Sequence, residues 1–186
     1  MKRTRKRQFF AALTGIAILG STMAAWSAGK NVAPPERIKI GFAAPLTGSQ
    51  SHYGQDFQHG IMLAVEQFNA EKHVINGKTV EVVLDAADDQ ADPHVATNVA
   101  QKLVDDGIKG MLGHFNSGTT IPASRIYAKA GIPQIAMATA AEYTQQGFET
   151  TFRMMTSDTQ QGVAAGEFVV NNLGFKRIAI IDESSL

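Results

Sequence analysis

The sequence contains no cysteine among its 186 residues. This absence excludes disulfide bonds, catalysis by a thiolate and metal sites built on cysteine. It also excludes a lipid-modified cysteine after an export signal, so we expect an exported form without a lipid anchor. The five histidines are scattered and have no metal-ligand spacing. We therefore expect neither a metal nor another cofactor.

Short motifs of common active sites are also missing. The sequence has neither the glycine-rich pattern of dinucleotide-binding folds nor a nucleotide phosphate loop. It has no G-x-S-x-G elbow, and no nucleophile paired with a base is visible. The aspartates of segment 85–92 do not follow the order of a calcium-binding loop. We expect a protein that is not an enzyme, and an exported α/β enzyme is the weaker alternative.

A formal net charge of zero hides an uneven distribution of charge. The first 28 residues carry five bases and no acids, which leaves 12 bases and 17 acids in the rest, a net charge of −5. A nucleic-acid-binding protein needs a basic face. This acidic remainder therefore argues against a nucleic-acid partner.

Residues 1–27 have the three parts of a secretory signal peptide. A basic segment (1–8) precedes an uncharged apolar segment (9–25) and a run of small residues. We predict cleavage after Ser27, because cleavage one residue later places the bulky Trp26 where a small residue is required. An uncleaved membrane anchor is the alternative, but the apolar segment is shorter than the roughly 20 residues that span a bilayer. We expect a periplasmic protein that is not membrane-embedded after cleavage, by an export route left open between the general and twin-arginine pathways.

After a linker at residues 28–36, strand patterns alternate with helical patterns. This alternation predicts an α/β fold with a parallel sheet flanked by helices. The expected strands cover 38–44, 79–85, 109–113, 132–137 and 177–182, with an extended segment at 151–154. The expected helices cover about 55–71, 93–106, 118–130 and 158–172.

Local signals support several of these boundaries. Asn76-Gly77 predicts a turn before the second strand. Asp92 and Pro93 are a plausible cap and first residue of a helix whose expected buried side is Val95, Val99 and Leu103. Asp158 is a plausible cap of the last helix. The chain stops just past an apolar strand pattern, where another helix is due, so we expect it to be truncated.

Ligands of open α/β sheets bind beyond the carboxyl ends of the strands. Three loops qualify there: 45–54, 114–120 and 138–142. In the middle loop, the start of a helix offers unpaired N–H groups and a dipole that favours an anion. Ser117 either caps this helix or donates its hydroxyl to an anion, and Gly118 lets a ligand approach the backbone.

Several short segments occur along the chain in a characteristic order and spacing. They are Ile38-Lys39-Ile40-Gly41, Pro45-Leu46-Thr47-Gly48, Tyr53-Gly54-Gln55-Asp56, Asn76-Gly77-Lys78, Asp92-Pro93, Asp106-Gly107, Gly113-His114, Ser117 to Ser124, Gly131-Ile132, Gln160-Gln161-Gly162 and Arg177-Ile178-Ala179-Ile180. Together they resemble the leucine/isoleucine/valine-binding proteins of branched-chain amino-acid ABC importers, and the resemblance covers nearly everything after the leader. It implies a type I periplasmic-binding-protein fold, with two lobes that close on the ligand: an incomplete N-terminal lobe at 37–152, then a crossover and the start of a truncated second lobe at 153–186.

The resemblance also assigns roles to single residues. Ser117 matches the serine that binds the ligand carboxylate, and Thr139 matches a threonine that adds a hydroxyl and a backbone N–H. Met137 matches the position whose backbone carbonyl meets the ligand ammonium group. The segment before Glu142 is one residue shorter than the common pattern, so Ala138 is the alternative carbonyl donor.

Further residues are expected around these. Tyr53 matches an aromatic residue that packs near the ligand, and Phe115 and Asn116 are expected to line the pocket. Several relatives join the acidic loop to the loop before the serine by a disulfide, but here those positions read Ala91 and Asn116. The second loop is then held by packing alone, or Asn116 faces the ligand.

The function that the resemblance implies is capture of a branched-chain or related amino acid and its delivery to an inner-membrane ABC permease. The alternative is a periplasmic sensor of amino acids or amides with the same fold.

Overall fold

The computed structural model describes residues 34–181, so the expected signal peptide lies outside the described residues. Within this range six strands form one sheet in the order β2-β3-β1-β4-β5-β6. The helices are α1 to α4, with a short 3-10 helix (Ala141–Thr144) and a π-helical turn (Phe168–Asn172). The strands are β1 Glu36–Ala44, β2 Val74–Ile75, β3 Lys78–Asp88, β4 Gly110–Gly113, β5 Gln134–Ala136 and β6 Thr151–Arg153. The α-helices are α1 Ser51–Ala70, α2 Pro93–Asp105, α3 Ser117–Lys129 and α4 Asp158–Glu167.

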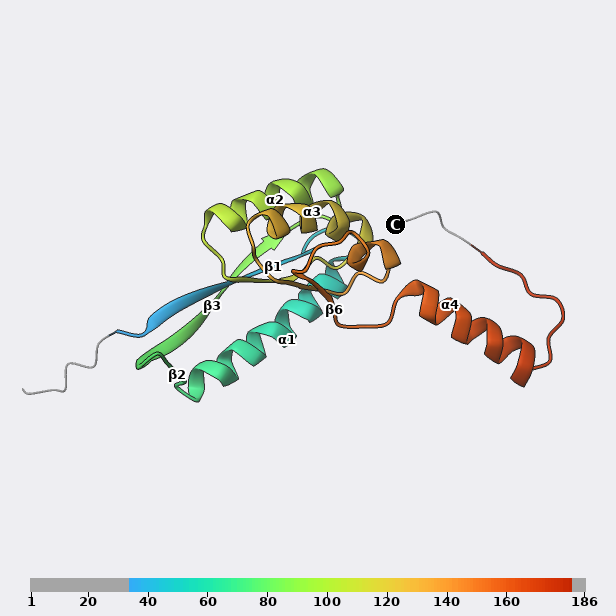
Figure 1. Cartoon of the computed structure of the whole chain (residues 1–186), viewed down its shortest axis with the longest axis horizontal. Coiled ribbons are helices and arrows are strands. Elements are labelled where there is room, and N and C mark those ends of the chain that lie inside the picture. The colour runs from blue at the N-terminus through green and yellow to red at the C-terminus, as the bar shows by residue number, and fades with distance from the viewer. Residues whose placement is uncertain (1–33, 182–186) are drawn as a thin grey trace, which may run out of the picture. The chain divides into compact units, whose positions relative to one another are not determined.

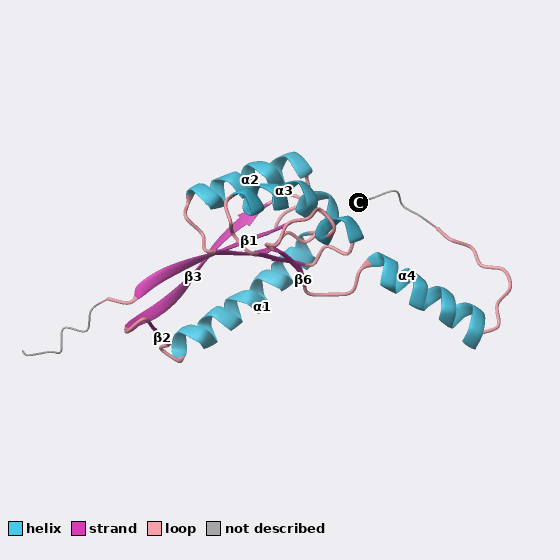
Figure 2. Cartoon of the chain, viewed as in Figure 1, coloured by secondary structure: helices cyan, strands magenta, loops and turns pink. Residues whose placement is uncertain are grey.

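All neighbouring strands from β3 to β6 are parallel, and only β2 runs antiparallel, against β3. Helices α2 and α3 cover one face of this sheet and α1 lies on the other (Figures 1 and 2). The predicted α/β fold with a parallel sheet and flanking helices is therefore confirmed. No helix in the part of the chain described is long and apolar enough to cross a membrane.

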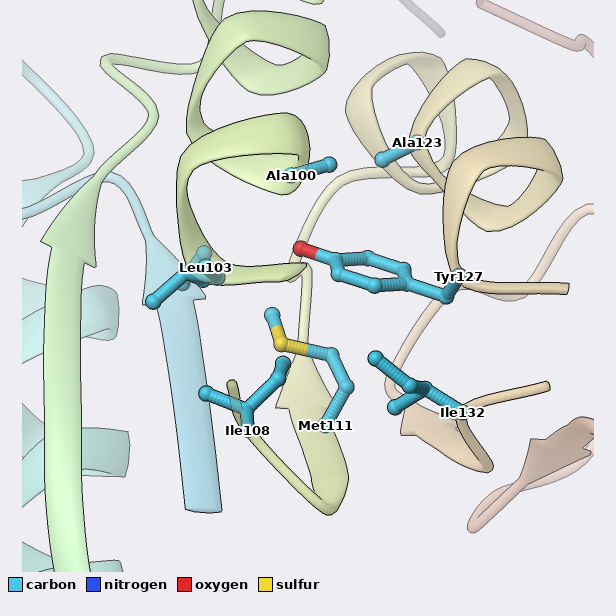
Figure 3. Packing of buried hydrophobic residues seen from close by; sticks show 8 residues of the cluster. Ala100, Leu103, Ile108, Met111, Ala123, Tyr127 and Ile132 are labelled. Atoms are coloured by element: carbon cyan, nitrogen blue, oxygen red, sulfur yellow. The ribbon is translucent and has the colours of Figure 1, made fainter. Parts of the chain in front are cut away.

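The main hydrophobic core fills the layer between the sheet and helices α2 and α3 (Figure 3). Leu103 of α2, Met111 of β4 and Tyr127 of α3 are almost fully buried there. On the opposite face, Phe42 of β1 packs edge-on against Phe57 of α1, with ring centroids 5.5 Å apart. The sheet is thus buried on both faces around β1, which explains the continuous apolar run of that strand.

Two of the three local boundary signals are confirmed, the turn at Asn76-Gly77 and the cap at Asp92. Asn76 and Gly77 form the two-residue connection between β2 and β3, and both have positive φ, 52° and 78°. A hairpin turn of this type requires positive φ at both central residues, which Asn and Gly tolerate best. The carboxylate of Asp92 accepts hydrogen bonds from the N–H groups of His94 and Val95, so it caps α2.

Helix α1 begins at Ser51, four residues earlier than expected. Gly54, interpreted as part of a loop, is a buried helical residue whose hypothetical Cβ would lie 2.0 Å from the carbonyl oxygen of Pro45. Glycine is therefore required by the close approach of the helix to the preceding loop. The prediction failed because the exposed, polar first turn carries no apolar periodicity.

Strand β3 continues to Asp88, three residues past the predicted end at Asp85. Ala86, Ala87 and Asp88 pair in parallel register with the last three residues of β1. Small and acidic residues have low strand propensity, but pairing with the neighbouring strand overrides it here.

The buried side of α2 also differs from the prediction. Ala96, Ala100 and Leu103 are fully buried, while Val95 and Val99 are only partly buried. Helices α2 and α3 approach closely at Ala100 and Ala123, as Figure 3 shows. Small residues permit this approach, and a pattern that weighs valine above alanine misses it.

Two predictions near the end of the chain are wrong. Ser157, not Asp158, caps α4, in a reciprocal capping box with Gln160. The helix itself continues past Glu167 as the π-helical turn to Asn172, the predicted end. The expected strand at 177–182 is not a strand over its described residues. Ile180 and Ile181 are 90% and 96% exposed, and they pair with none of the strands among the described residues.

Candidate functional site

A cavity of about 310 Å³ lies beyond the carboxyl ends of β4 and β5. Five of the eight predicted site residues line it, together with one that the sequence did not suggest, Met155. None of these lining side chains is titratable, so the cavity offers hydroxyl, amide and apolar groups. The six lining residues are Phe115, Asn116, Ser117, Met137, Thr139 and Met155.

Ser117 is the first residue of α3, and Asn116 occupies the cap position before it. The carbonyl oxygen of Asn116 accepts the N–H groups of Thr119 and Thr120, which closes the first turn. Ser117 therefore does not act as the helix cap. Its Oγ accepts a hydrogen bond from the N–H of Ala140 at 3.2 Å, which leaves the hydroxyl hydrogen to donate elsewhere.

The electrostatics at Ser117 favour an anion. The positive end of the helix dipole lies at the first turn of α3, where a negative group is stabilised. A serine hydroxyl at the same point adds a hydrogen-bond donor. The combination can bind a carboxylate without any basic side chain in the cavity wall.

The loop after β5 brings Met137 and Thr139 to the cavity and turns Ala138 away from it. Ala138 is 1% exposed, and its carbonyl oxygen accepts a hydrogen bond from Arg153 Nη1 at 2.8 Å. The same Nη1 donates to the carbonyl oxygen of Ala140 at 2.9 Å. Arg153 thus holds the backbone on both sides of Thr139, and the carbonyl of Ala138 already has a partner.

Besides Ala138, two more predicted residues do not line the cavity. Tyr53, on α1, stacks on Phe115 with ring centroids 5.4 Å apart and an interplanar angle of 12°, and it is 52% exposed. Tyr53 therefore stands behind the cavity wall that Phe115 forms. Gly118 is the second residue of α3 and is not among the lining residues.

The loop before Ser117 is tied to the loop before α1 by a side-chain pair. Asn116 Nδ2 donates to Gln50 Oε1 at 2.7 Å. Asn116 Oδ1 is buried and has no partner among the described residues. Gln50 could not be predicted from the sequence, because nothing in its local pattern distinguishes it from other polar loop residues.

Asp88, at the end of β3, organises the same loop before α1. Partial burial raises the pKa of its carboxyl group, but hydrogen bonds from the Thr47 hydroxyl and from the N–H groups of Gln90, Leu46 and Thr47 outweigh burial, and the net pKa is lowered. The carboxylate accepts the N–H of Leu46 at 2.8 Å. An ionised Asp88 therefore fixes the path of the chain toward Gln50.

The model of the periplasmic binding protein family matches residues 37–185, and the chain belongs to this family. The expectation of a binding protein rather than an enzyme agrees with that membership. The chain is 38% identical over 149 residues to Leu/Ile/Val-binding protein homolog 1 of Brucella abortus, covering 80% of this chain and 39% of that protein. It is 39% identical, over the same shares, to a leucine-, isoleucine-, valine-, threonine- and alanine-binding protein of Pseudomonas aeruginosa.

A solved structure gives the same picture. The branched-chain amino acid transporter substrate binding protein of Streptococcus pneumoniae, in complex with isoleucine, superposes with a TM-score of 0.66 at 33% identity. The match covers 75% of this chain and 39% of that one. The chain thus spans about two fifths of the length of the relatives it matches.

Proposed function

We propose that the cavity at Ser117 binds the carboxylate of an amino acid, and that the intact protein delivers branched-chain or related amino acids to an ABC permease from the periplasm. The observation that carries the proposal is the convergence of two hydroxyl side chains, Ser117 and Thr139, on one cavity at the start of α3. The amino acids named for the two bacterial relatives and the isoleucine of the solved structure support this ligand class.

The strength of such a site is of the right order. Each hydrogen bond to a charged group contributes about 1.5–3 kcal/mol. A micromolar dissociation constant corresponds to about 8 kcal/mol. Two hydroxyl donors and the helix start account for a large part of that free energy, and burial of the ligand side chain against Phe115, Met137 and Met155 adds to it.

Ser117→Ala in the intact protein tests the carboxylate assignment by titration calorimetry with leucine, isoleucine and valine. Loss of one charge-assisted hydrogen bond is expected to raise each dissociation constant about tenfold or more. Ser124→Ala is the matched control, because Ser124 lies on the same helix but its hydroxyl donates to the carbonyl oxygen of Ile121. Equal affinities of wild type and Ser117→Ala for all three amino acids would contradict the assignment.

A transport function and a sensor function predict different effects of gene deletion on amino-acid uptake. If the protein delivers its ligand to a permease, amino-acid uptake by cells is expected to fall when the gene is deleted and to return with the wild-type protein. Return of uptake with Ser124→Ala but only weakly with Ser117→Ala supports both the site and the transport role. Unchanged uptake on deletion would favour the sensor.

A further inference from the structure

A buried polar network of three residues includes His114, which directly precedes the cavity-lining segment 115–117 in the sequence. Asp89, His114 and Tyr127 are each 0% exposed. His114 Nδ1 lies 2.7 Å from Asp89 Oδ2, and His114 Nε2 lies 3.2 Å from the Tyr127 hydroxyl oxygen. Asp89 follows β3, His114 follows β4 and Tyr127 belongs to α3, so one imidazole ring joins three elements.

Each of the three groups has a hydrogen-bond partner. A carboxylate only accepts hydrogen bonds, so His114 Nδ1–H donates to Asp89. Burial first, and then the nearby Asp89 carboxylate, raises the pKa of the Tyr127 hydroxyl, which therefore keeps its proton. That hydroxyl pairs with His114 Nε2, so the imidazole ring is held on both sides.

Asp89 and the residue before His114 are both held by further hydrogen bonds to strands. The N–H of Asp89 donates to the carbonyl oxygen of Ala44 at the end of β1, and Asp89 Oδ1 accepts the N–H of Ala91. Gln134 Nε2 of β5 donates to the carbonyl oxygen of Gly113 at 2.8 Å. His114 therefore has little freedom, and the chain that leaves it reaches the cavity within one to three residues, at Phe115, Asn116 and Ser117.

We propose that Asp89, His114 and Tyr127 are positioning residues of the ligand site: they fix the loop that presents Phe115 and Ser117, and ligand affinity depends on them although none lines the cavity. The inference rests on the proposed function of that cavity. A buried charge contributes weakly to stability compared with apolar packing, but such a network can select one arrangement of the chain.

Tyr127→Phe in the intact protein is the main test, because it removes a single buried oxygen and keeps the ring in the core. Without ligand, hydrogen–deuterium exchange of the segment 113–118 is expected to become faster than in wild type. The dissociation constant for isoleucine is expected to rise about fivefold, which is the effect expected from the loss of one hydrogen bond. Ser124→Ala, which removes another buried hydroxyl from α3, is expected to change neither measurement.

Two further variants separate positioning from general stability. His114→Asn keeps an N–H donor in reach of Asp89 and is expected to retain more protection of 113–118 than His114→Leu does. In the Ser117→Ala background, Tyr127→Phe is expected to weaken isoleucine binding by less than it does in wild type, because it acts through Ser117.

A lower melting temperature of Tyr127→Phe with wild-type exchange at 113–118 and wild-type affinity would overturn the inference and leave the network with a purely structural role. If Ser117→Ala binds like wild type, the proposed carboxylate site is wrong, and exchange at 113–118 in Tyr127→Phe still decides whether the network holds the loop.

Discussion

The two hydroxyl side chains of the cavity, Ser117 and Thr139, come from loops after neighbouring strands and are held by different contacts. Ser117 is fixed through its own oxygen by the N–H of Ala140. Thr139 is fixed through its backbone, because Arg153 binds the carbonyl oxygens of Ala138 and Ala140 on either side. Both contacts converge on the segment 138–140, so the same short segment holds Ser117 and Thr139 in place.

The contribution of Asp88 to the stability of the protein is expected to depend on pH. Its pKa in the folded protein lies below the ordinary value of 3.8, because hydrogen bonds to its carboxylate outweigh burial. A group whose pKa is lowered by folding stabilises the protein above its unfolded pKa, and this stabilisation is lost as the pH falls through the folded pKa. Asp88→Asn is therefore expected to be less stable than wild type at neutral pH, with the difference shrinking below about pH 4.

Urea unfolding of the intact protein between pH 7 and pH 3 measures this difference. Asp56→Asn, which removes an exposed carboxylate of α1, is the control and is expected to follow the wild-type pH dependence. A difference between wild type and Asp88→Asn that stays constant down to pH 3 would show that the carboxylate is not the group that holds the loop.

The role of a residue could be predicted only where a suitable residue type directly follows a predicted strand. The position of Ser117 at a helix start after an apolar strand could be inferred from the pattern, and so could its competition between capping and anion binding. The structure excludes the capping alternative, because Asn116 occupies the cap, and anion binding by Ser117 stays a prediction. The contacts of Gln50 and Arg153 could not be inferred, since they join residues 66 and 15 positions apart and leave no local periodicity.

Among the helices and strands, α1 contains two glycines with different structural roles. Gly54 is buried against Pro45, whereas Gly60 of the same helix is exposed and has open space where a Cβ would be. The sequence alone treats both as weak points of a helix. The helix start was therefore placed too late, after the glycine that in fact belongs to its first turns.

Gly54→Ala and Gly60→Ala are expected to have opposite effects on the free energy of unfolding. At Gly54 the added methyl group would lie 2.0 Å from the Pro45 oxygen, and overpacking of this kind costs about 1–3 kcal/mol. At Gly60 alanine is expected to stabilise the helix by about 0.5–1 kcal/mol, because it reduces the conformational freedom of the unfolded chain.

Denaturant unfolding of the two variants side by side provides the measurement. Because Gly60→Ala is chemically the same substitution in the same helix, it controls for helix propensity. A Gly54→Ala variant as stable as Gly60→Ala would contradict the close approach between α1 and the loop at Pro45.

The packing of α2 against α3 was also predicted only in part. The alternation of strands and helices predicted that these helices cover the sheet, because it depends only on period and order. It did not predict that alanines form the contact, since close helix approach depends on the partner helix. The strand expected at 177–182 failed for a related reason: an apolar run becomes a strand only where a neighbouring strand satisfies its backbone.

At the scale of the whole molecule, the fold class and the family follow from features spread along residues 37–185. The division into two lobes at 152/153, the signal peptide at 1–27 and export to the periplasm stay predictions. The described residues place the two hydroxyl side chains and the start of α3 at the cavity, whose lining includes no acidic side chain. We therefore propose that this part of the protein binds the carboxylate end of the ligand.

A crystal structure of the intact protein with bound leucine tests that assignment most directly. We expect a carboxylate oxygen of leucine to lie within hydrogen-bond distance of Ser117 Oγ, and the Thr139 hydroxyl to contact the same carboxylate. A leucine bound elsewhere, or one whose ammonium group faces Ser117, would contradict it.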